Sequence, residues 1–253
     1  MTGMATLSKE EITRYDRQML IDGWGEAGQQ RLKSSTAFVA GAGGLGSPVS
    51  IYLAVAGVGK IVICDADVVE LSNLNRQILH PEGNLGEQKA VSAGGSLRAL
   101  NSTIEIVTHA AYLDDGNIEG ILDKPDLIVD CLDNFETRYL LNRYTIQNDI
   151  PMVHGAVWGM MGQLSFIHPP ETPCLKCIFP KAPPKEVFPV VGAAPGVIGC
   201  MQAMEALKYL TGIGTNLKGK LLIFEGEDMS TTSLDVQRVS ACSDCGRLSP
   251  VNS

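Results

Sequence analysis

A glycine-rich turn, and an acid that follows it, have the residue types and spacing of a nucleotide site. The turn reads Gly41-Ala-Gly-Gly-Leu-Gly46, and its glycines are Gly41, Gly43, Gly44 and Gly46. Glycines let the backbone approach a phosphate, and the N–H groups that open the following helix attract negative charge. Asp65 stands 19 positions after Gly46, where a carboxylate can accept hydrogen bonds from ribose hydroxyls. Glycines that serve only packing are the competing interpretation.

The polar residues beyond Asp65 favour ATP over NAD. Arg76 and Lys89 lie in the crossover after the second predicted strand, and Asn73 and Gln77 can hydrogen-bond phosphate or ribose. Asp133, in Asp-Cys-Leu-Asp-Asn, follows a later strand and is placed to hold magnesium. An NAD site neutralises its pyrophosphate largely with backbone N–H groups, whereas expelling pyrophosphate from ATP requires cations. Each polar residue alone could be an ordinary surface residue, so the prediction rests on the set.

Two C-x-x-C pairs predict a structural metal site. The pairs are separated by 64 residues and consist of Cys174 with Cys177 and Cys242 with Cys245. Four thiolates can hold zinc tetrahedrally with no open coordination position. Neither pair is expected to open a helix as in a thioredoxin-like redox site. The sequence therefore predicts a zinc ion that clips the C-terminus onto the body of the protein.

The elements that must position these residues alternate along the first part of the chain. Apolar runs of strand length alternate with helical stretches up to Val157, which predicts a mostly parallel, Rossmann-like α/β sheet covered on both faces. Antiparallel strands follow in the second part. The expected strands are Ala37–Ala40, Ile61–Cys64, Ile104–Thr108, Leu127–Asp130, Met152–Val157, Gly162–Ile167, Lys220–Phe224 and Ser233–Val239. The expected helices include one opened by a Ser8–Glu11 capping box, others near 26–34, 45–56, 87–100, 117–122 and 136–148, and a late one from about Val197 to Leu210.

We expect a single domain over 1–253, with a nucleotide-binding half at 1–157 and a zinc-clipped, partner-binding half at 158–253. The net charge of −8 argues against a sequence-independent grip on nucleic acid. The uncharged stretch 34–59 is long enough to span a membrane, but its six glycines and Pro48 predict strand, turn and helix instead. No secretory signal is visible, so we expect a cytoplasmic protein.

The motifs together resemble a known family. Tyr-Asp-Arg-Gln around Arg17, the glycine turn, Ser-Asn-Leu-Asn-Arg-Gln at 72–77, Lys89 and Asp-Cys-Leu-Asp-Asn are similar to those of the ubiquitin-activating-enzyme-like adenylyltransferases. The chain looks most like the MoeB, ThiF and HesA group, from Arg17 to Cys245. The resemblance implies ATP-dependent adenylation of the C-terminal glycine carboxylate of a small ubiquitin-like sulfur carrier ending in Gly-Gly, of the MoaD or ThiS kind.

The resemblance also implies roles for single residues. Asp65 would bind the ribose, Asn73, Arg76 and Lys89 the phosphates, and Asp133 the magnesium. Arg17 would reach across a homodimer into the site of the other subunit; from the sequence alone it is an ordinary helix-surface arginine. Many relatives carry a zinc on two such cysteine pairs.

The remaining thiols separate two branches of the family. Some relatives have a cysteine in the loop before the late helix that takes the carrier as a thioester or mixed disulfide, and here the loop 185–195 has none. Cys200 lies near the expected helix start, where the helix dipole could lower a thiol pKa, but we interpret it as a buried packing residue. Cys64 and Cys131 are expected to be inert core thiols. The chain is therefore most like MoeB, with a covalent carrier adduct as the alternative.

Other interpretations stay open. An NAD-dependent oxidoreductase would explain the glycine turn and Asp65 but not Arg76, Lys89 or Asp133. A zinc-stabilised binding protein with an inactive site, and an activator of a carboxylate on modified tRNA, are further alternatives. Trp158, Met160 and Met161 are expected in the core or in an interface, and no role is assigned to the histidines. The carrier, its pathway (molybdopterin, thiamin or other) and the sulfur donor, for which a sulfurtransferase is a candidate, are not identified.

Overall fold

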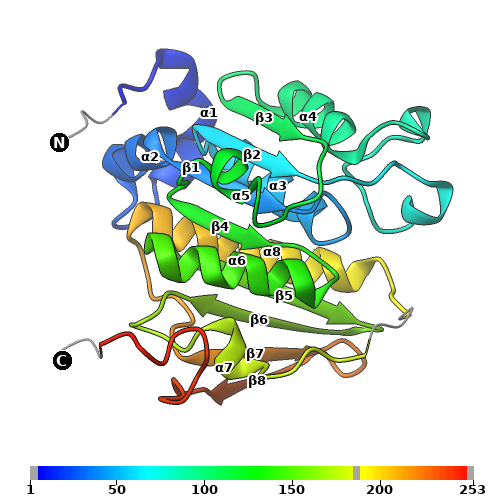
Figure 1. The fold of residues 1–253 in the computed structure, drawn as a ribbon. Helices are drawn as coiled ribbons and strands as arrows, with labels where there is room; N and C mark the ends of the chain where they lie inside the picture. The colour runs from blue at the N-terminus through cyan, green and yellow to red at the C-terminus, as the bar shows by residue number, and fades with distance from the viewer. Residues whose placement is uncertain (1–4, 185–188, 250–253) are drawn as a thin grey trace.

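The computed structural model describes residues 5–184 and 189–249, and these residues form one eight-stranded sheet flanked by helices (Figure 1). The strand order is β3-β2-β1-β4-β5-β6-β7-β8. The strands are β1 Thr36–Ala40, β2 Lys60–Cys64, β3 Glu105–His109, β4 Leu127–Asp130, β5 Met152–Trp158, β6 Met161–Ile167, β7 Lys220–Glu225 and β8 Ser230–Asp235.

The sheet is parallel from β3 to β5 and antiparallel from β5 to β8, which confirms the predicted fold class. β1 pairs with β2 on one side and with β4 on the other. The chain thus adds strands first on one side of β1 and then on the other, which makes this the topological switch point of the sheet. Ligands of such sheets bind in the crevice beyond the carboxyl ends of the strands at this point. The turn that starts with Gly41 follows β1, and Cys131 follows β4.

Two layers of helices cover the sheet, because the central parallel strands carry apolar side chains on both faces. Val39 packs into the core cluster that contains α3 and α8, whereas Phe38 packs into the cluster that contains α5 and α6. The helices are α1 Lys9–Met19, α2 Gly25–Ser34, α3 Gly46–Ala56, α4 Lys89–Leu100, α5 Ile118–Leu122, α6 Phe135–Asn148, α7 Leu175–Ile178 and α8 Ala193–Thr211, with the 3-10 turns η1 Leu71–Asn73 and η2 Glu82–Asn84.

Three local predictions are wrong. The late helix begins at Ala193, not near Val197, because Pro195 stands in its first turn, where a missing N–H costs no helical bond. The last strand ends at Asp235, not at Val239. Cys174 caps the one-turn helix α7, so the first cysteine pair does open a short helix.

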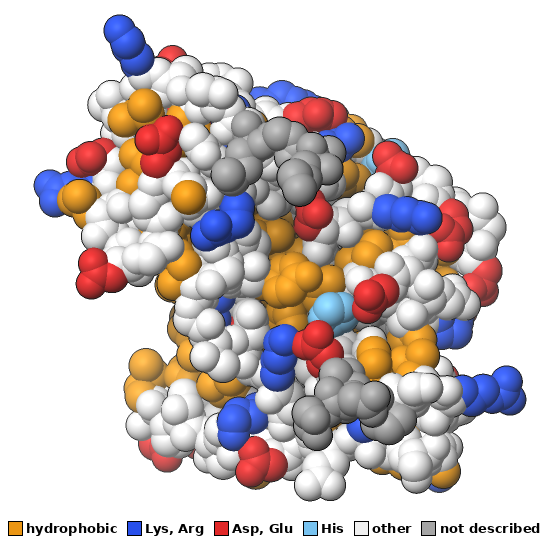
Figure 2. All heavy atoms as spheres, turned by 90° about the vertical axis from the view of Figure 1, so that its left-hand side faces the viewer, with side chains coloured by type: hydrophobic (Ala, Val, Ile, Leu, Met, Phe, Trp, Pro, Cys, Tyr) orange, Lys and Arg blue, Asp and Glu red, His pale blue; other side chains and the backbone are white. Residues whose placement is uncertain are grey.

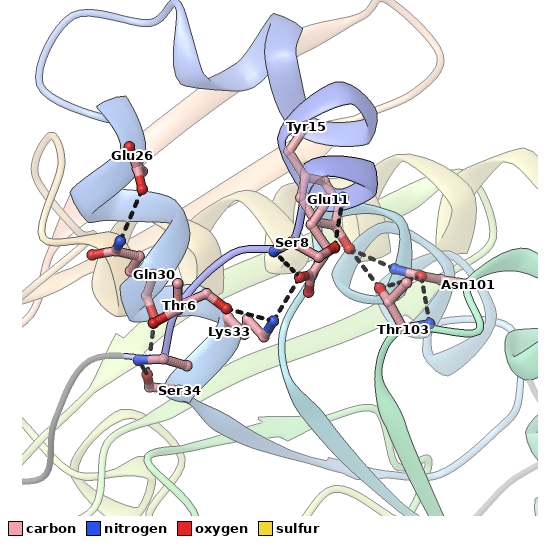
Figure 3. A network of polar contacts seen from close by, with 11 residues as sticks. Thr6, Ser8, Glu11, Tyr15, Glu26, Gln30, Lys33, Ser34, Asn101 and Thr103 are labelled. Carbon is pink, nitrogen blue, oxygen red and sulfur yellow. Dashed lines mark hydrogen bonds and ion pairs between the residues drawn. The ribbon is translucent and has the colours of Figure 1, made fainter.

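α1 is fixed at the edge where the parallel strands begin. Its predicted capping box is present, since Ser8 Oγ accepts from Glu11 N at 3.2 Å and Glu11 Oε2 accepts from Ser8 N at 2.7 Å. Tyr15 Oη accepts from Asn101 Nδ2 at 2.8 Å, just before the chain enters β3 (Figure 3). α1 therefore lies at the end of the sheet opposite the crevice beyond β1 and β4 (Figure 1).

Figure 2 views the edge where the parallel strands begin. Hydrophobic side chains line a hollow at its centre, and basic and acidic side chains are interspersed around it.

The uncharged stretch 34–59 forms β1, the glycine turn and α3, as predicted. Among the helices of residues 5–184 and 189–249, none combines the length and the apolar character needed to cross a membrane.

Candidate functional site

The glycine turn brings the start of α3 against the loop after β4. Gly41 has φ +96°, and a Cβ there would lie 2.9 Å from the carbonyl oxygen of Cys131. A Cβ at Gly46 would lie 2.0 Å from the carbonyl oxygen of Gly41. Within the described residues, no side chain caps the N-terminus of α3. Ser47 N donates to the Gly43 carbonyl oxygen and Pro48 has no N–H, so the N–H groups of residues 43–46 in the turn are those available to a phosphate.

Asp65 lies directly beside this turn. Its Oδ2 accepts a hydrogen bond from Ala42 N at 2.7 Å, and its Oδ1 accepts one from Asp67 N at 2.9 Å. Burial raises the pKa of Asp65, although the two backbone N–H groups act in the opposite direction. The predicted ribose acid is thus held in place by backbone contacts on both sides.

Lys89 is the first residue of α4 and is 6% exposed. Its Nζ lies 3.0 Å from Asp67 Oδ2, and its backbone N donates to the carbonyl oxygen of Asp67 at 2.8 Å. The Asp67 side chain is 57% exposed, so the ion pair is open to solvent on the acid's side only. A buried ammonium beside Asp65 and the glycine turn suits an anionic ligand.

Gln77 supplies a buried group whose bonding is incomplete. It is 5% exposed, and its Oε1 has no hydrogen-bond partner among the described residues. A Cβ at Gly43 would lie 3.5 Å from Gln77 Nε2, so the amide faces the glycine turn. Unsatisfied buried polar atoms are uncommon, and a bound ligand is one explanation.

Asn73 and Arg76 occupy the same loop. Asn73 Oδ1 accepts from Glu70 N at 3.3 Å. Arg76 Nη1 donates to the Ser72 carbonyl oxygen and to Asn75 Oδ1, each at 2.9 Å. The guanidinium is thus held by two neutral oxygens, and no acidic side chain pairs with it among the described residues.

The start of α8 closes this side of the site. A Cβ at Gly192 would lie 2.2 Å from the Asn75 carbonyl oxygen, and one at Gly44 would lie 3.2 Å from Pro195 Cβ. The loop with Arg76, the glycine turn and α8 are therefore packed together.

Asp133 is exposed in the short loop between β4 and α6. The next residue, Asn134, caps α6, because its Oδ1 accepts from Thr137 N at 2.9 Å. The loop reaches the glycine turn through the close approach of Cys131 to Gly41. Asp133 thus lies two residues beyond the contact between Cys131 and the glycine turn.

Arg17 is the one predicted site residue that the fold places elsewhere. It is exposed in the last turn of α1, at the end of the sheet opposite the crevice with the glycine turn. In the described part of the chain its side chain makes no hydrogen bond or ion pair. It therefore does not complete the site of its own chain.

Several buried polar groups at the site are not among the predicted site residues. His80 is buried; its Nε2 donates to the Ala42 carbonyl oxygen at 2.8 Å, and burial lowers its pKa. Asp130, Arg138 and His154 form a further buried cluster below the loop that carries Asp133. A polar residue inside an apolar strand, such as His154 in β5, is the pattern that could have indicated it.

The four paired cysteines come together. Their sulfur atoms all lie within 4.8 Å of one another, with Cys174 Sγ 3.6 Å from Cys242 Sγ and Cys177 Sγ 3.4 Å from Cys245 Sγ. Val239 N also points at Cys177 Sγ from 3.4 Å. Four clustered thiols are the donor set and number that structural zinc requires.

The other thiols do not resemble nucleophiles. Burial raises the pKa of Cys64 to about 12 and that of Cys131 well above its ordinary value. Cys200 is exposed rather than buried, and it is the eighth residue of α8, not near its start, because the helix begins four residues early. Burial also raises its pKa, so the predicted dipole effect, which is confined to the first turn, does not apply.

The expectation of a core position for three apolar residues is wrong as well. Trp158, Met160 and Met161 are 47%, 44% and 41% exposed at the hairpin between β5 and β6. They are larger and more apolar than typical surface residues, which leaves the interface interpretation.

Fold and site together define a doubly wound α/β protein with a nucleotide crevice at its switch point. The chain belongs to the ThiF family, whose sequence model matches residues 15–245. This confirms the family resemblance found in the motifs.

Relatives of known name extend over most of the chain. It is 42% identical to the sulfur carrier protein adenylyltransferase of Thermus thermophilus, covering 94% of this chain and 92% of that protein. It is 40% identical to the SAMP-activating enzyme E1 of Haloferax volcanii, covering 95% and 91%. It is 43% identical to the mouse adenylyltransferase and sulfurtransferase MOCS3, covering 88% of this chain but 50% of that protein. The chain thus spans about half the length of MOCS3.

A solved structure has the same fold. The crystal structure of Escherichia coli MccB with MccA-N7isoASN superposes with a TM-score of 0.85 and 23% identity, over 97% of this chain and 77% of MccB. At this identity the likeness concerns the fold alone.

Proposed function

We propose that this protein adenylates the C-terminal glycine carboxylate of a small ubiquitin-like sulfur carrier. The observation that carries the proposal is the packing of the glycine turn with Asp65, Gln77 and the buried Lys89, in a chain of the ThiF family. Relatives named as sulfur carrier protein adenylyltransferase and SAMP-activating E1 support this substrate class.

The chemistry requires no nucleophile from the protein. A carboxylate oxygen of the carrier attacks the α-phosphorus of ATP, the bond from that phosphorus to the bridging oxygen breaks, and pyrophosphate leaves with the electron pair. The carboxylate is already ionised at neutral pH, so the protein has to align the reactants and neutralise charge.

The site residues divide this task. Asp65 accepts hydrogen bonds from the ribose, as its position beside the turn suits. Asn73, Arg76, Gln77 and Lys89 bind the phosphates, and the N–H groups at the start of α3 add to them. Gln77 Nε2 can donate to a phosphate, and the orphaned Oε1, which only accepts, gains a partner from a donor such as a ribose hydroxyl when the nucleotide binds.

Magnesium belongs to the same proposal. Asp133 is an exposed carboxylate at the crevice, and oxygen ligands are those that magnesium prefers. The bound ion would neutralise charge on the phosphates. Asp133 would hold it, and the surrounding loop would keep Asp133 in place.

Arg17 supports a homodimer. α1 lies at the end of the sheet where the parallel strands begin, opposite the crevice. An Arg17 that contacts a nucleotide therefore has to act on the site of a second subunit. The charge it brings would stabilise the departing pyrophosphate.

The second half of the chain, 158–253, carries the zinc site and contacts the carrier, whereas 1–157 binds the nucleotide, both within one domain. The exposed Trp158, Met160 and Met161 offer an apolar surface next to the crevice side of the chain. Zinc on the four cysteines would tie the C-terminal segment to the body.

The alternatives are less well supported. An NAD-dependent oxidoreductase leaves Lys89 and Asp133 without a task. A covalent carrier adduct needs a thiol in the 185–195 loop, which has none. The sulfur donor is a separate question, since MOCS3 carries sulfurtransferase in its name and this chain spans half of it.

Carrier-dependent ATP–pyrophosphate exchange tests the proposal. Small proteins ending in Gly-Gly are each assayed against the same protein without its last two residues. We expect exchange with at least one intact carrier and none with its truncated form. Absence of exchange with every carrier, or exchange that survives truncation, would refute the proposal.

A further inference from the structure

A fully buried ionic cluster lies below the loop that carries Asp133. Asp130 ends β4, Arg138 lies in α6, and His154 lies in β5; the three are 0%, 4% and 0% exposed. Asp130 Oδ2 lies 2.7 Å from His154 Nδ1 and 3.3 Å from Arg138 Nε. α6 runs in front of β4 and β5 in the view of Figure 1.

The cluster's remaining hydrogen bonds go to backbone near Asp133. Arg138 Nη2 donates to the Leu132 carbonyl oxygen and, at 3.0 Å, to the Gly155 carbonyl oxygen. Asp130 Oδ1 accepts from Leu132 N at 3.1 Å. Both polar backbone groups of Leu132 are therefore bound by the cluster, and the following Asn134 is fixed as the cap of α6. Asp133 stands between two anchored residues.

Stability alone is a poor explanation for this arrangement. Removing two charges from water costs several kcal/mol each, and apolar residues of similar volume often stabilise a core as well or better. Burial alone would raise the pKa of Asp130, but Arg138 and His154 hold it below its usual range. Asp130 therefore stays charged and continues to hold the Arg138 guanidinium, which in turn holds the loop.

We propose that Arg138, held by Asp130 and His154, is a positioning residue that sets the backbone of Asp133 for binding of metal and ATP. The inference rests on the proposed function of the crevice. Arg138 Nη2 donates to both Leu132 and Gly155 while Nε faces Asp130, and a lysine ammonium keeps the charge but cannot present two nitrogens in this planar arrangement.

The test is a double-mutant cycle on the binding of Mn²⁺ in the presence of ATP. Electron paramagnetic resonance measures the Mn²⁺ binding. Arg138→Lys should weaken Mn²⁺ binding about tenfold, as loss of an outer partner of a metal ligand typically does. In an Asp133→Ala background the same change should have no further effect, because Arg138 acts through Asp133. Arg143→Lys, on the exposed side of α6, is the control and should bind as the wild type does.

The contrary results are distinct. An equal loss in both backgrounds, no loss with Arg138→Lys, or an equal loss with Arg143→Lys would overturn the inference. If Arg138→Lys does not fold, His154→Gln takes its place with the same outcomes. Failure of the wild type itself to bind Mn²⁺ with ATP would refute the proposed function instead, before any variant is compared.

Discussion

At the scale of single residues, Lys89 best illustrates how the site is built. Its side chain is 8% exposed, and its ammonium has one acidic partner, Asp67, whose own side chain is mostly in solvent. A nearly buried cation beside a phosphate-binding turn is costly unless an anion completes its environment. Asp67 serves this purpose without nucleotide, and ATP phosphates would do so when bound.

Lys89→Met removes this charge while keeping the length of the side chain. We expect carrier-dependent exchange to fall ~10²–10³-fold in kcat/KM, the range for losing one group that stabilises transition-state charge. Lys60→Met is the control, because Lys60 pairs with Glu105 on the surface, where an ion pair contributes about 0–1 kcal/mol. Equal effects of the two substitutions would contradict the assigned role.

The site could be predicted in part because its residues follow strands. Asp65 and Asp133 lie in loops at strand ends and Lys89 is the first residue of α4, and the apolar runs in the sequence predict the order of these elements. His80 and Arg138 could not be found, because their burial depends on neighbours distant in the chain, and His154 is marked only by its polar type within the apolar strand β5. Cys200 was misjudged for the same reason, since its exposure depends on how α8 packs.

At the scale of elements, the glycine turn is the contact between β1 and the loop after β4. Gly41→Ala would place a methyl group 2.9 Å from the Cys131 carbonyl oxygen in a left-handed conformation. We expect a loss of ~1–3 kcal/mol in the free energy of unfolding, and weaker ATP binding, since the turn shifts. Chemical denaturation and ATP titration measure both.

Gly95→Ala in α4 is the matched control. A Cβ at Gly95 meets nothing within 4 Å, and its φ is not positive. Alanine is the better helix former there, so we expect a gain of ~0.5–1 kcal/mol with unchanged ATP binding. A Gly41→Ala protein as stable as this control would show that the turn tolerates a side chain.

The elements themselves were largely predictable. β4 has the bounds expected from its apolar run, and the other parallel strands differ by one or two residues. α8 and β8 were misplaced because proline tolerates a first helical turn, and because β8 is exposed along its length and lacks an apolar pattern.

At the scale of the whole molecule, the four cysteines connect segments far apart in the sequence. Cys242→Ser should remove bound zinc and lower the melting temperature by roughly 4–8 °C, corresponding to a loss of about 2 kcal/mol. Cys200→Ser, outside the cluster, should leave both unchanged. Metal analysis with thermal unfolding measures them; unchanged metal content in Cys242→Ser would contradict a zinc site here.

Dimer formation makes a prediction for mixed subunits. Arg17→Ala and Lys89→Met should each be inactive alone, since each removes a charge from every site. When the two are unfolded together and refolded, a heterodimer has one site with both substitutions and one with neither. Exchange should then return to about a quarter of the wild-type rate for symmetric pairing. No recovery, with correct dimers verified, would contradict action of Arg17 across subunits.

The central claim, transfer of AMP to a carrier carboxylate, is tested most directly by isotope. The protein is incubated with magnesium, a carrier ending in Gly-Gly, and ATP labelled at the α- or the γ-phosphorus. Label from α-labelled ATP on the carrier, with γ-label released as pyrophosphate, is the expected result. Label transferred from the γ-position, or no label on any intact carrier, would contradict it.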